Sequence, residues 1–141
     1  MSKSSNTNKL RALSKAMDSV FEAKPKRANF YEKVYMIVEQ IPVGKVTTYG
    51  AIAETLGMKG SSRQVGQALT AVPKDMEIPA QRVINRIGAL SGAHHFGGYE
   101  VMRALLEREG VTFIAEIVDM EQHFWHPSEL GEDILVEIRG F

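Results

Sequence analysis

This sequence lacks the cysteine thiol, the side chain that is the strongest nucleophile in proteins. The chain has 141 residues and no cysteine, which excludes a thiol nucleophile, a thiolate metal ligand and a disulfide. The run Pro79-Ala80-Gln81-Arg82-Val83-Ile84 shows the consequence. An alanine methyl cannot accept a transferred group, and a glutamine amide does not titrate near neutral pH. If this run is a site, it lacks both a nucleophile and a base.

Four histidines have to be weighed as metal ligands. His94 and His95 are adjacent on a glycine-rich stretch, and His123 and His126 flank Phe124 and Trp125. Adjacent histidines on such a loop are usually solvated, so we expect no metal site and no cofactor. We interpret the segment from Phe124 as a packed aromatic anchor.

The composition is that of one globular domain, with 44% hydrophobic and 24% charged residues. No stretch approaches the roughly 18 consecutive apolar residues of a membrane span, and the N-terminus lacks the apolar core of a secretory signal. We therefore expect a soluble protein without a membrane partner. Its expected location is the cytoplasm, in association with the nucleoid if the source is bacterial.

The charges are unevenly spread although the formal net charge is +0. Residues 1–29 carry seven basic and two acidic side chains, whereas residues 111–141 carry one basic and seven acidic ones. A basic end can approach phosphates and an acidic end is repelled by them, but solvated tails of either sign give the same counts. Charge alone does not choose between these interpretations.

Two helices are expected in the first part of the chain. Apolar residues recur at helical spacing over residues 9–22, which predicts an amphipathic helix. Residues 24–27 have the composition of a linker, and Asn29 with Glu32 would form a capping box for the second helix. The residues expected on its buried face are Val34, Ile37, Val38 and Ile41.

A helix-turn-helix pattern follows. Thr48 is a good N-cap for a helix over residues 49–56, and Gly57 suits the end of that helix. A second helix, capped by Ser61 or Ser62, comes after a tight turn. Two short helices joined by a glycine-containing turn are typical of this motif.

The rest of the chain predicts short elements. Residues 82–85 are expected to be extended, with Gly88 in the turn that follows, and residues 98–108 to be helical. Residues 111–118 are a β candidate, and residues 134–138 are a weaker one. The residues expected to face inward from the helix over 98–108 are Val101, Ala104 and Leu105. The fold class is therefore mostly α with a short β element.

Four blocks of the sequence resemble, in order, those of the O6-alkylguanine-DNA alkyltransferases. The blocks are IPVGKVTTYGAIA at 41–53, RQVGQA at 63–68, PAQRVI at 79–84 and LLEREG at 105–110. In that family a cysteine thiolate takes an alkyl group from a flipped-out guanine. The resemblance covers roughly residues 30–113 and implies a winged helix-turn-helix-like DNA-binding domain, as in the alkyltransferase C-terminal domain.

The resemblance also implies a division of the chain. Residues 1–28 would be a partly disordered N-terminal extension, and residues 29–127 would be the alkyltransferase-like DNA-binding domain. Residues 128–141 would then be an acidic C-terminal extension. The resemblance leaves the roles of both extensions open.

The family's catalytic residues are a cysteine, a histidine and a glutamate, which together produce a reactive thiolate. The matching positions here are Ala80, Gln81 and, by an ungapped placement from the 105–110 block, Arg103. All three catalytic roles are therefore expected to be vacant. This pattern is similar to the alkyltransferase-like proteins, which bind alkylated guanine without repairing it and flag the site for nucleotide excision repair.

The resemblance implies a non-enzymatic, monomeric protein whose partners are double-stranded DNA containing O6-alkylguanine and nucleotide excision repair proteins. Arg63 would enter the duplex and fill the space of the rotated nucleotide, since a planar guanidinium can stack in the base column. Tyr49 would press on a phosphate, and small residues on the second helix would allow close approach in the minor groove. The full set of expected DNA contacts is Thr48, Tyr49, Ser62, Arg63, Gln64, Gly66 and Gln67.

The same resemblance predicts a lesion pocket. Its expected lining is Tyr49, Ala80, Arg82, Val83, Ile84 and Ser91, with Arg82 mainly a scaffold residue. An alanine in place of a larger residue would give a roomier floor. Val72 stands where the family has an asparagine before the proline of the preceding loop, so that asparagine's hydrogen bonds are absent.

Two other function classes stay open on the sequence. One is a helix-turn-helix regulator or structural DNA binder, which would prefer a particular undamaged sequence. The scarcity of base-reading side chains on residues 63–71 argues against this class. The other is an enzyme that uses another nucleophile or a water molecule. Nothing at Ala80 or Gln81 supports such an enzyme.

Overall fold

Helices make up most of the structure, which is a computed structural model that describes residues 25–140. In chain order the elements are α2 (Pro25–Gln40), β1 (Thr47–Thr48), α3 (Tyr49–Thr55), α4 (Ser62–Thr70), η1 (Ala80–Arg82), β2 (Val83–Ile84), η2 (Ala93–Phe96), α5 (Tyr99–Arg108), β3 (Phe113–Ile114), β4 (Ile117–Val118), α6 (Met120–His123), η3 (Pro127–Glu129) and α7 (Glu132–Gly140). The two sheets have two strands each. The predicted fold class, mostly α with short β elements, is confirmed.

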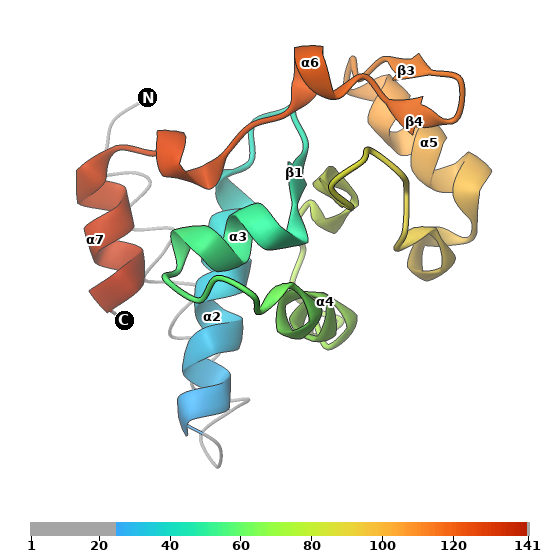
Figure 1. Ribbon diagram of the computed structural model, residues 1–141. Coiled ribbons are helices and arrows are strands. Elements are labelled where there is room, and N and C mark those ends of the chain that lie inside the picture. The colour runs from blue at the N-terminus through green and yellow to red at the C-terminus, as the bar shows by residue number, and fades with distance from the viewer. Residues whose placement is uncertain (1–24, 141) are drawn as a thin grey trace.

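Two clusters of buried apolar side chains hold these elements together. The larger joins α2, α3, α4 and α7, and the smaller lies between β2, α5 and the β3–β4 hairpin. Strand β2 belongs to both, because Val83 packs in the larger cluster and Ile84 in the smaller, as the alternation of side chains along a strand requires. Figure 1 shows α2 and α7 on one side of the molecule and α5 with the hairpin on the other.

Helix α2 begins earlier than expected. Residues 25–27, predicted to belong to a linker, lie in its first turn, so Asn29 lies inside the helix and is not its N-cap. Proline suits the first turn of a helix, because its fixed φ is helical and its missing N–H is not needed there. The predicted buried face is confirmed, since Val34, Ile37, Val38 and Ile41 are at most 2% exposed. The helix predicted over residues 9–22 lies outside the described residues.

Helices α3 and α4 form the predicted helix-turn-helix. The Thr48 hydroxyl accepts a hydrogen bond from the Ala51 N–H at 3.0 Å, which confirms the N-cap. Gly57 follows α3 with a φ of +75°, a conformation that favours glycine. The buried Tyr35 hydroxyl of α2 donates to the Ala68 carbonyl oxygen of α4, and burial raises the pKa of this phenol. This bond fixes α4 against α2.

Helix α5 buries a different face from the predicted one. Met102 and Leu106 are fully buried, whereas Val101 is 47% exposed and Ala104 is also exposed. The β3–β4 hairpin and the smaller cluster select the Met102 and Leu106 stripe, which hydropathy alone did not distinguish from its neighbour. The β candidate over residues 111–118 is the hairpin itself, with Phe113 opposite Val118.

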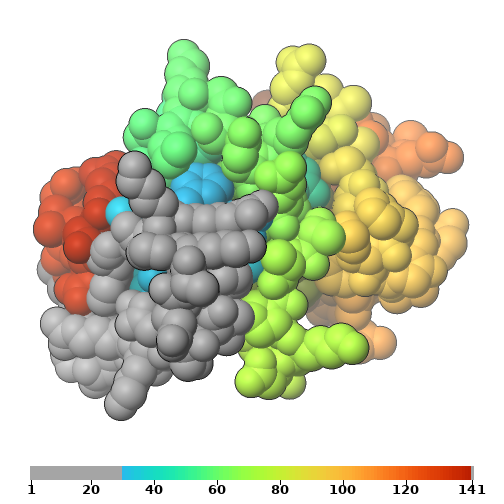
Figure 2. Space-filling view, turned by 90° about the horizontal axis from the view of Figure 1, so that it is seen from below, coloured from blue at the N-terminus to red at the C-terminus, as the bar shows by residue number. Residues whose placement is uncertain are grey.

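The C-terminal segment is helical and belongs to the larger cluster, which corrects one expectation. Residues 134–138 were predicted to be a β strand, but Ile134, Leu135 and Ile138 lie on one buried stripe of α7. The Lys33 ammonium donates to the Arg139 carbonyl oxygen at 2.9 Å, which ties α7 to α2. Residues 132–140 therefore pack against the rest of the fold. Figures 1 and 2 both place α7 on the flank opposite α5.

Among residues 25–140, no helix combines the length and the apolar character needed to cross a bilayer.

We expect Ile138→Ala to lower the free energy of unfolding by about 3 kcal/mol, because Ile138 is 0% exposed and the change leaves a cavity. Val136→Ala is the matched control, since Val136 lies on the same helix and is 59% exposed. Its effect should stay below about 0.5 kcal/mol. Urea unfolding followed by circular dichroism measures both. Equally small effects would show that α7 is not part of the cooperative fold.

Candidate nucleic-acid interface

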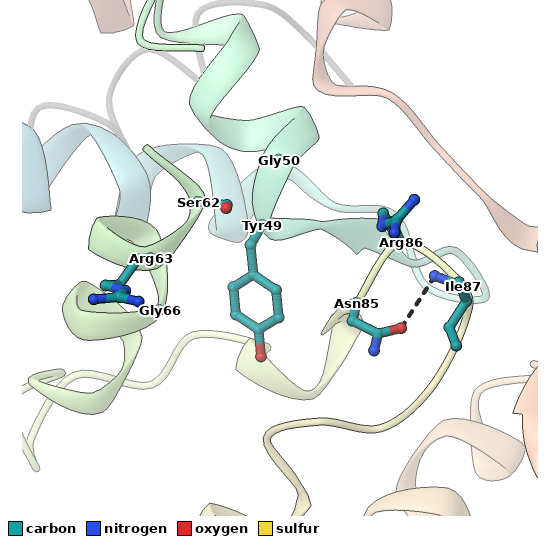
Figure 3. Close-up of a pocket in the computed structure, with 8 residues that line it drawn as sticks. All are labelled: Tyr49, Gly50, Ser62, Arg63, Gly66, Asn85, Arg86 and Ile87. Atoms are coloured by element: carbon teal, nitrogen blue, oxygen red, sulfur yellow. Dashed lines mark hydrogen bonds between the residues drawn. The ribbon is translucent and has the colours of Figure 1, made fainter. Parts of the chain in front are cut away.

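A pocket of about 550 Å³ lies where three segments meet. The start of α3 and the start of α4 form one side, and the turn after β2 forms the other. Its lining residues are Tyr49, Gly50, Ser62, Arg63, Gly66, Asn85, Arg86 and Ile87. In Figure 3, Tyr49 stands at the centre of this Tyr49 pocket, with Arg63 to one side and Arg86 to the other. Figure 2 shows the green α4 region bordering the yellow segment near residue 90 on one face of the molecule.

The parallel pairing of β1 with β2 builds this pocket. Thr47 lies opposite Val83 and Thr48 opposite Ile84. Because parallel strands end at the same edge, the residues that follow them, Tyr49 and Asn85, are brought to the same place. Neither residue is near the other in the sequence, so the pairing is what makes them neighbours.

Two glycines border the Tyr49 side chain. A Cβ built on Gly66 would lie 3.9 Å from the ring, an ordinary contact, whereas one built on Gly92 would lie only 3.2 Å from the Tyr49 hydroxyl oxygen. Any larger side chain at residue 92 would press on the hydroxyl. The ring is therefore held between α4 and the segment that begins at Gly92. Ser91, which was predicted to line the lesion pocket, is exposed and does not line this one.

The wall opposite α4 is a braced turn. The Asn85 side-chain oxygen accepts hydrogen bonds from the Ile87 N–H at 3.1 Å and the Ala89 N–H at 2.9 Å. Gly88 has a φ of +94°, and a Cβ there would come within 2.8 Å of the Val118 carbonyl oxygen. Only glycine fits this position, which holds the turn against the β3–β4 hairpin.

Helix α4 presents a polar face to solvent. Val65 and Ala68 are buried, whereas Arg63, Gln64 and Gln67 are exposed. The first turn of α4 has no acidic residue and carries Arg63, although a cation at a helix N-terminus opposes the helix dipole. Ser61 makes no side-chain capping bond, so the N–H groups of this turn are not capped by its hydroxyl. An anion bound at this end of α4 would accept hydrogen bonds from these N–H groups and would offset the charge of Arg63.

A smaller pocket of about 350 Å³ shares Gly50 and Ser62 with the Tyr49 pocket. Thr48 lines it, as do Lys59 and His126. Of the residues predicted to contact DNA, Tyr49, Ser62, Arg63 and Gly66 line the larger pocket, and Thr48 and Ser62 line the smaller one. Gln64 and Gln67 line neither of these two pockets and remain predictions.

Gln81 and Arg82 are tied to one carboxylate. The Gln81 amide donates to Glu109 at 2.8 Å, and Arg82 donates through Nε and Nη2 to both Glu109 oxygens at 2.9 and 3.0 Å. Arg82 Nη1 also donates to the Ile41 carbonyl oxygen at 2.8 Å. The side chains of Arg82 and Glu109 are only 13% and 18% exposed. Arg82 is therefore a structural residue that joins η1, α5 and the end of α2.

The structure corrects the placement of Arg103. Arg103 donates to Glu107 at 3.1 Å and to the Ala115 carbonyl oxygen at 2.9 Å, on the side of α5 that meets the hairpin. Hydrogen bonds to Tyr99 and Glu107 raise the pKa of its guanidinium. The carboxylate beside Gln81 is Glu109, which caps the C-terminal end of α5. A carboxylate therefore lies beside Gln81, whereas Arg103, which ungapped counting placed there, lies in the middle of α5 with other partners.

Of the residues predicted to line a lesion pocket, Tyr49 lines the Tyr49 pocket, and the role of the others stays a prediction. Val83 and Ile84 are 1% and 0% exposed and belong to the core, so their side chains do not face this pocket. Ala80 and Arg82 lie on η1, which packs against α5 instead of lining the Tyr49 pocket. The sequence analysis missed Gly50, Asn85, Arg86 and Ile87. The turn predicted at Gly88 indicated that Asn85, Arg86 and Ile87 lie at the end of a strand. No signal in the sequence indicated the strand pairing that carries them to Tyr49.

The histidines have structural partners. The Thr112 N–H donates to His123 Nε2 at 3.0 Å, which leaves the proton on Nδ1 to donate to the Gly44 carbonyl oxygen at 2.9 Å. His126 Nε2 lies 2.9 Å from a Glu54 carboxylate oxygen. Trp125 is 7% exposed in the larger cluster, in line with a packed anchor. Within residues 25–140, no three histidine, aspartate or glutamate side chains gather in a way that could hold a metal ion.

Proteins of similar sequence bind DNA, in agreement with this geometry. The family model of the 6-O-methylguanine DNA methyltransferase DNA binding domain matches residues 29–111. Alkyltransferase-like protein 1 of Schizosaccharomyces pombe is 40% identical over 103 residues, which cover 70% of this chain and 95% of that protein. The chain belongs to this family, among its alkyltransferase-like members.

Two further comparisons place the chain within this family. A DNA base-flipping protein of Vibrio parahaemolyticus is 36% identical over 102 residues, covering 70% of this chain and 97% of that protein. The crystal structure of Schizosaccharomyces pombe Atl1 in complex with damaged DNA containing O6-carboxymethylguanine superposes with a TM-score of 0.58 at 38% identity. That match covers 68% of this chain and 94% of the other. The winged helix-turn-helix-like fold is therefore established.

We expect Ala80→Cys to transfer a methyl group from O6-methylguanine only slowly. Gln81 supplies no base, so the thiol keeps a pKa near its ordinary value of about 8.5 and the rate rises with pH toward that value. Ala80→Cys/Gln81→His places an imidazole beside Glu109 and should react about 100-fold faster. Mass spectrometry of each protein after mixing with the modified duplex measures the rate. Fast stoichiometric methylation of the single variant would contradict the assignment of Gln81.

Proposed function

We propose that the protein binds O6-alkylguanine in duplex DNA, rotates the modified nucleotide out of the helix and holds it without transferring the alkyl group. The observation that carries this proposal is the combination of an intact Tyr49 pocket with a chain that has no cysteine. Its relatives support the same reading, since Schizosaccharomyces pombe Atl1 has been solved with damaged DNA.

Arg63 and Tyr49 have the chemistry that flipping needs. Arg63 is exposed, and no hydrogen bond or ion pair occupies it within the described part of the chain. Its planar face can replace the rotated base in the stack, while its donors reach the orphaned cytosine. Tyr49 lies beside it on the first turn of α3, where its hydroxyl can press on the backbone phosphate. An alkylated guanine pairs poorly, so the lesion itself lowers the cost of rotation.

A protein that cannot remove the lesion can act only by presenting it to others. Ala80 and Gln81 supply no nucleophile and no base, and Arg82 already occupies the Glu109 carboxylate. We therefore propose that the partners are nucleotide excision repair proteins and that the protein works as a monomer on duplex DNA. The acidic helix α7 lies on the flank opposite α5 (Figure 1). DNA bound at the Tyr49 pocket would therefore be only weakly repelled by the carboxylates of α7.

The proposal is tested by affinities for duplexes that differ only in one base. We expect a duplex with one O6-methylguanine to bind at least tenfold more tightly than the unmodified duplex, which corresponds to about 1.4 kcal/mol. Competition gel shifts at fixed salt measure this ratio. Equal affinities would contradict the proposed function. A preference for one undamaged sequence over others would point to a helix-turn-helix regulator.

Arg63→Ala should weaken binding to the modified duplex by at least about tenfold and should reduce the preference for the lesion. The reason is that the finger contributes only when a nucleotide has left the stack. Arg108→Ala is the matched control, because Arg108 is an exposed arginine that lines neither pocket. If Arg63→Ala weakens modified and unmodified duplexes by the same factor, Arg63 is a phosphate contact and not a finger.

A further inference from the structure

The Tyr49 pocket has two arginines and no acidic residue among its lining residues. Arg63 reaches it from α4, and Arg86 from the opposite wall (Figure 3). Two like charges around one pocket repel each other and raise the local positive potential. An anionic group in the pocket, or along its rim, would remove that cost.

Arg86 is not used by the fold. Three other arginines are held by oxygen atoms of the protein: Arg82 by Glu109, Arg103 by Glu107, and Arg139 by the Thr55 carbonyl oxygen at 3.1 Å. Arg86 makes no hydrogen bond or ion pair within residues 25–140, and its side chain is exposed. Its guanidinium donors are therefore all available to a ligand.

The turn that carries Arg86 is rigid. Asn85 receives two backbone N–H groups of the turn, and the Val118 N–H donates to the Gly88 carbonyl oxygen at 3.0 Å. Arg86 is thus presented from a fixed backbone, which lowers the entropy lost when it binds. Ile87 extends beside it, is 58% exposed and lines the same pocket, so its side chain is accessible to a ligand held by Arg86.

We propose that the turn from Asn85 to Ala89 is a second DNA-binding element, in which Arg86 binds a backbone phosphate and Ile87 packs on the adjoining deoxyribose. Together with Arg63 on α4, it would hold the strand from both sides of Tyr49. This inference rests on the proposed DNA binding, but it does not require a preference for the lesion. A phosphate and a carboxylate on the alkyl adduct have the same anionic chemistry, so the test must separate the two.

The test measures binding of wild type, Arg86→Ala and Arg86→Lys to three duplexes of one sequence over a range of salt concentrations. The duplexes carry guanine, O6-methylguanine or O6-carboxymethylguanine at the same position. We expect Arg86→Ala to weaken all three about equally, by roughly tenfold at low salt. The slope of log K against log salt should fall by about one unit, and Arg86→Lys should keep most of that slope. Arg108→Ala is the control for loss of charge alone.

Each outcome decides the proposal. A loss confined to the O6-carboxymethylguanine duplex would place the anion on the adduct and overturn the phosphate assignment. An Arg86→Ala variant that matches Arg108→Ala on every duplex would overturn the whole inference. If wild type binds all three duplexes equally, the lesion-binding function fails, and the loss on unmodified DNA still tests the turn.

Ile87→Ser should weaken binding about threefold without changing the salt slope, because it removes apolar contact and no charge. An unchanged affinity would remove Ile87 from the element.

Discussion

The ion pair between Arg82 and Glu109 joins three segments that are distant in the sequence. It ties η1 to the end of α5, and through the Ile41 carbonyl oxygen it reaches the end of α2. The two core clusters meet at the same place, because the next strand, β2, places one side chain in each. Removing either partner would leave a mostly buried charge without compensation, which is far more costly than the pair is favourable. The position of β2, and with it the Tyr49 pocket, depends on this pair.

The same carboxylate bears on the proposal that this protein binds a lesion without chemistry. In a thiol enzyme of this family, a histidine and a glutamate would activate the cysteine. Here Glu109 is present, but it holds Arg82 and the Gln81 amide, and neither can take a proton near neutral pH. The scaffold of the site is therefore kept by structural hydrogen bonds, while the groups that would react are absent. On the opposite side of β2, the ends of two parallel strands bring Tyr49 to the Asn85 turn, which needs no catalytic residue.

Local signals in the sequence predicted local structure well. Thr48 as an N-cap, Gly57 after α3 and the buried face of α2 all depend on neighbours within one or two turns, and each was found. The errors came where distant contacts decide. Hydropathy on α5 did not choose between the Val101 and Met102 stripes until the hairpin was in place. The isoleucines of α7 had helical spacing, but a short apolar run is compatible with either element. Arg103 was placed by counting along the chain, whereas the position of Glu109 is set by the folded contact with Gln81. Arg86 and Ile87 reach the pocket only through strand pairing, so the turn expected at Gly88 did not show that they lie beside Tyr49.

The central claim is that this protein holds an alkylated guanine and leaves it unchanged. The most direct measurement is mass spectrometry of both components after long incubation of the protein with an equimolar duplex containing one O6-methylguanine, under conditions where the complex is formed. The account predicts that the DNA strand keeps its methyl group and that the protein keeps its original mass. A protein heavier by one methyl group, or a strand that has lost its methyl group to water, would contradict it.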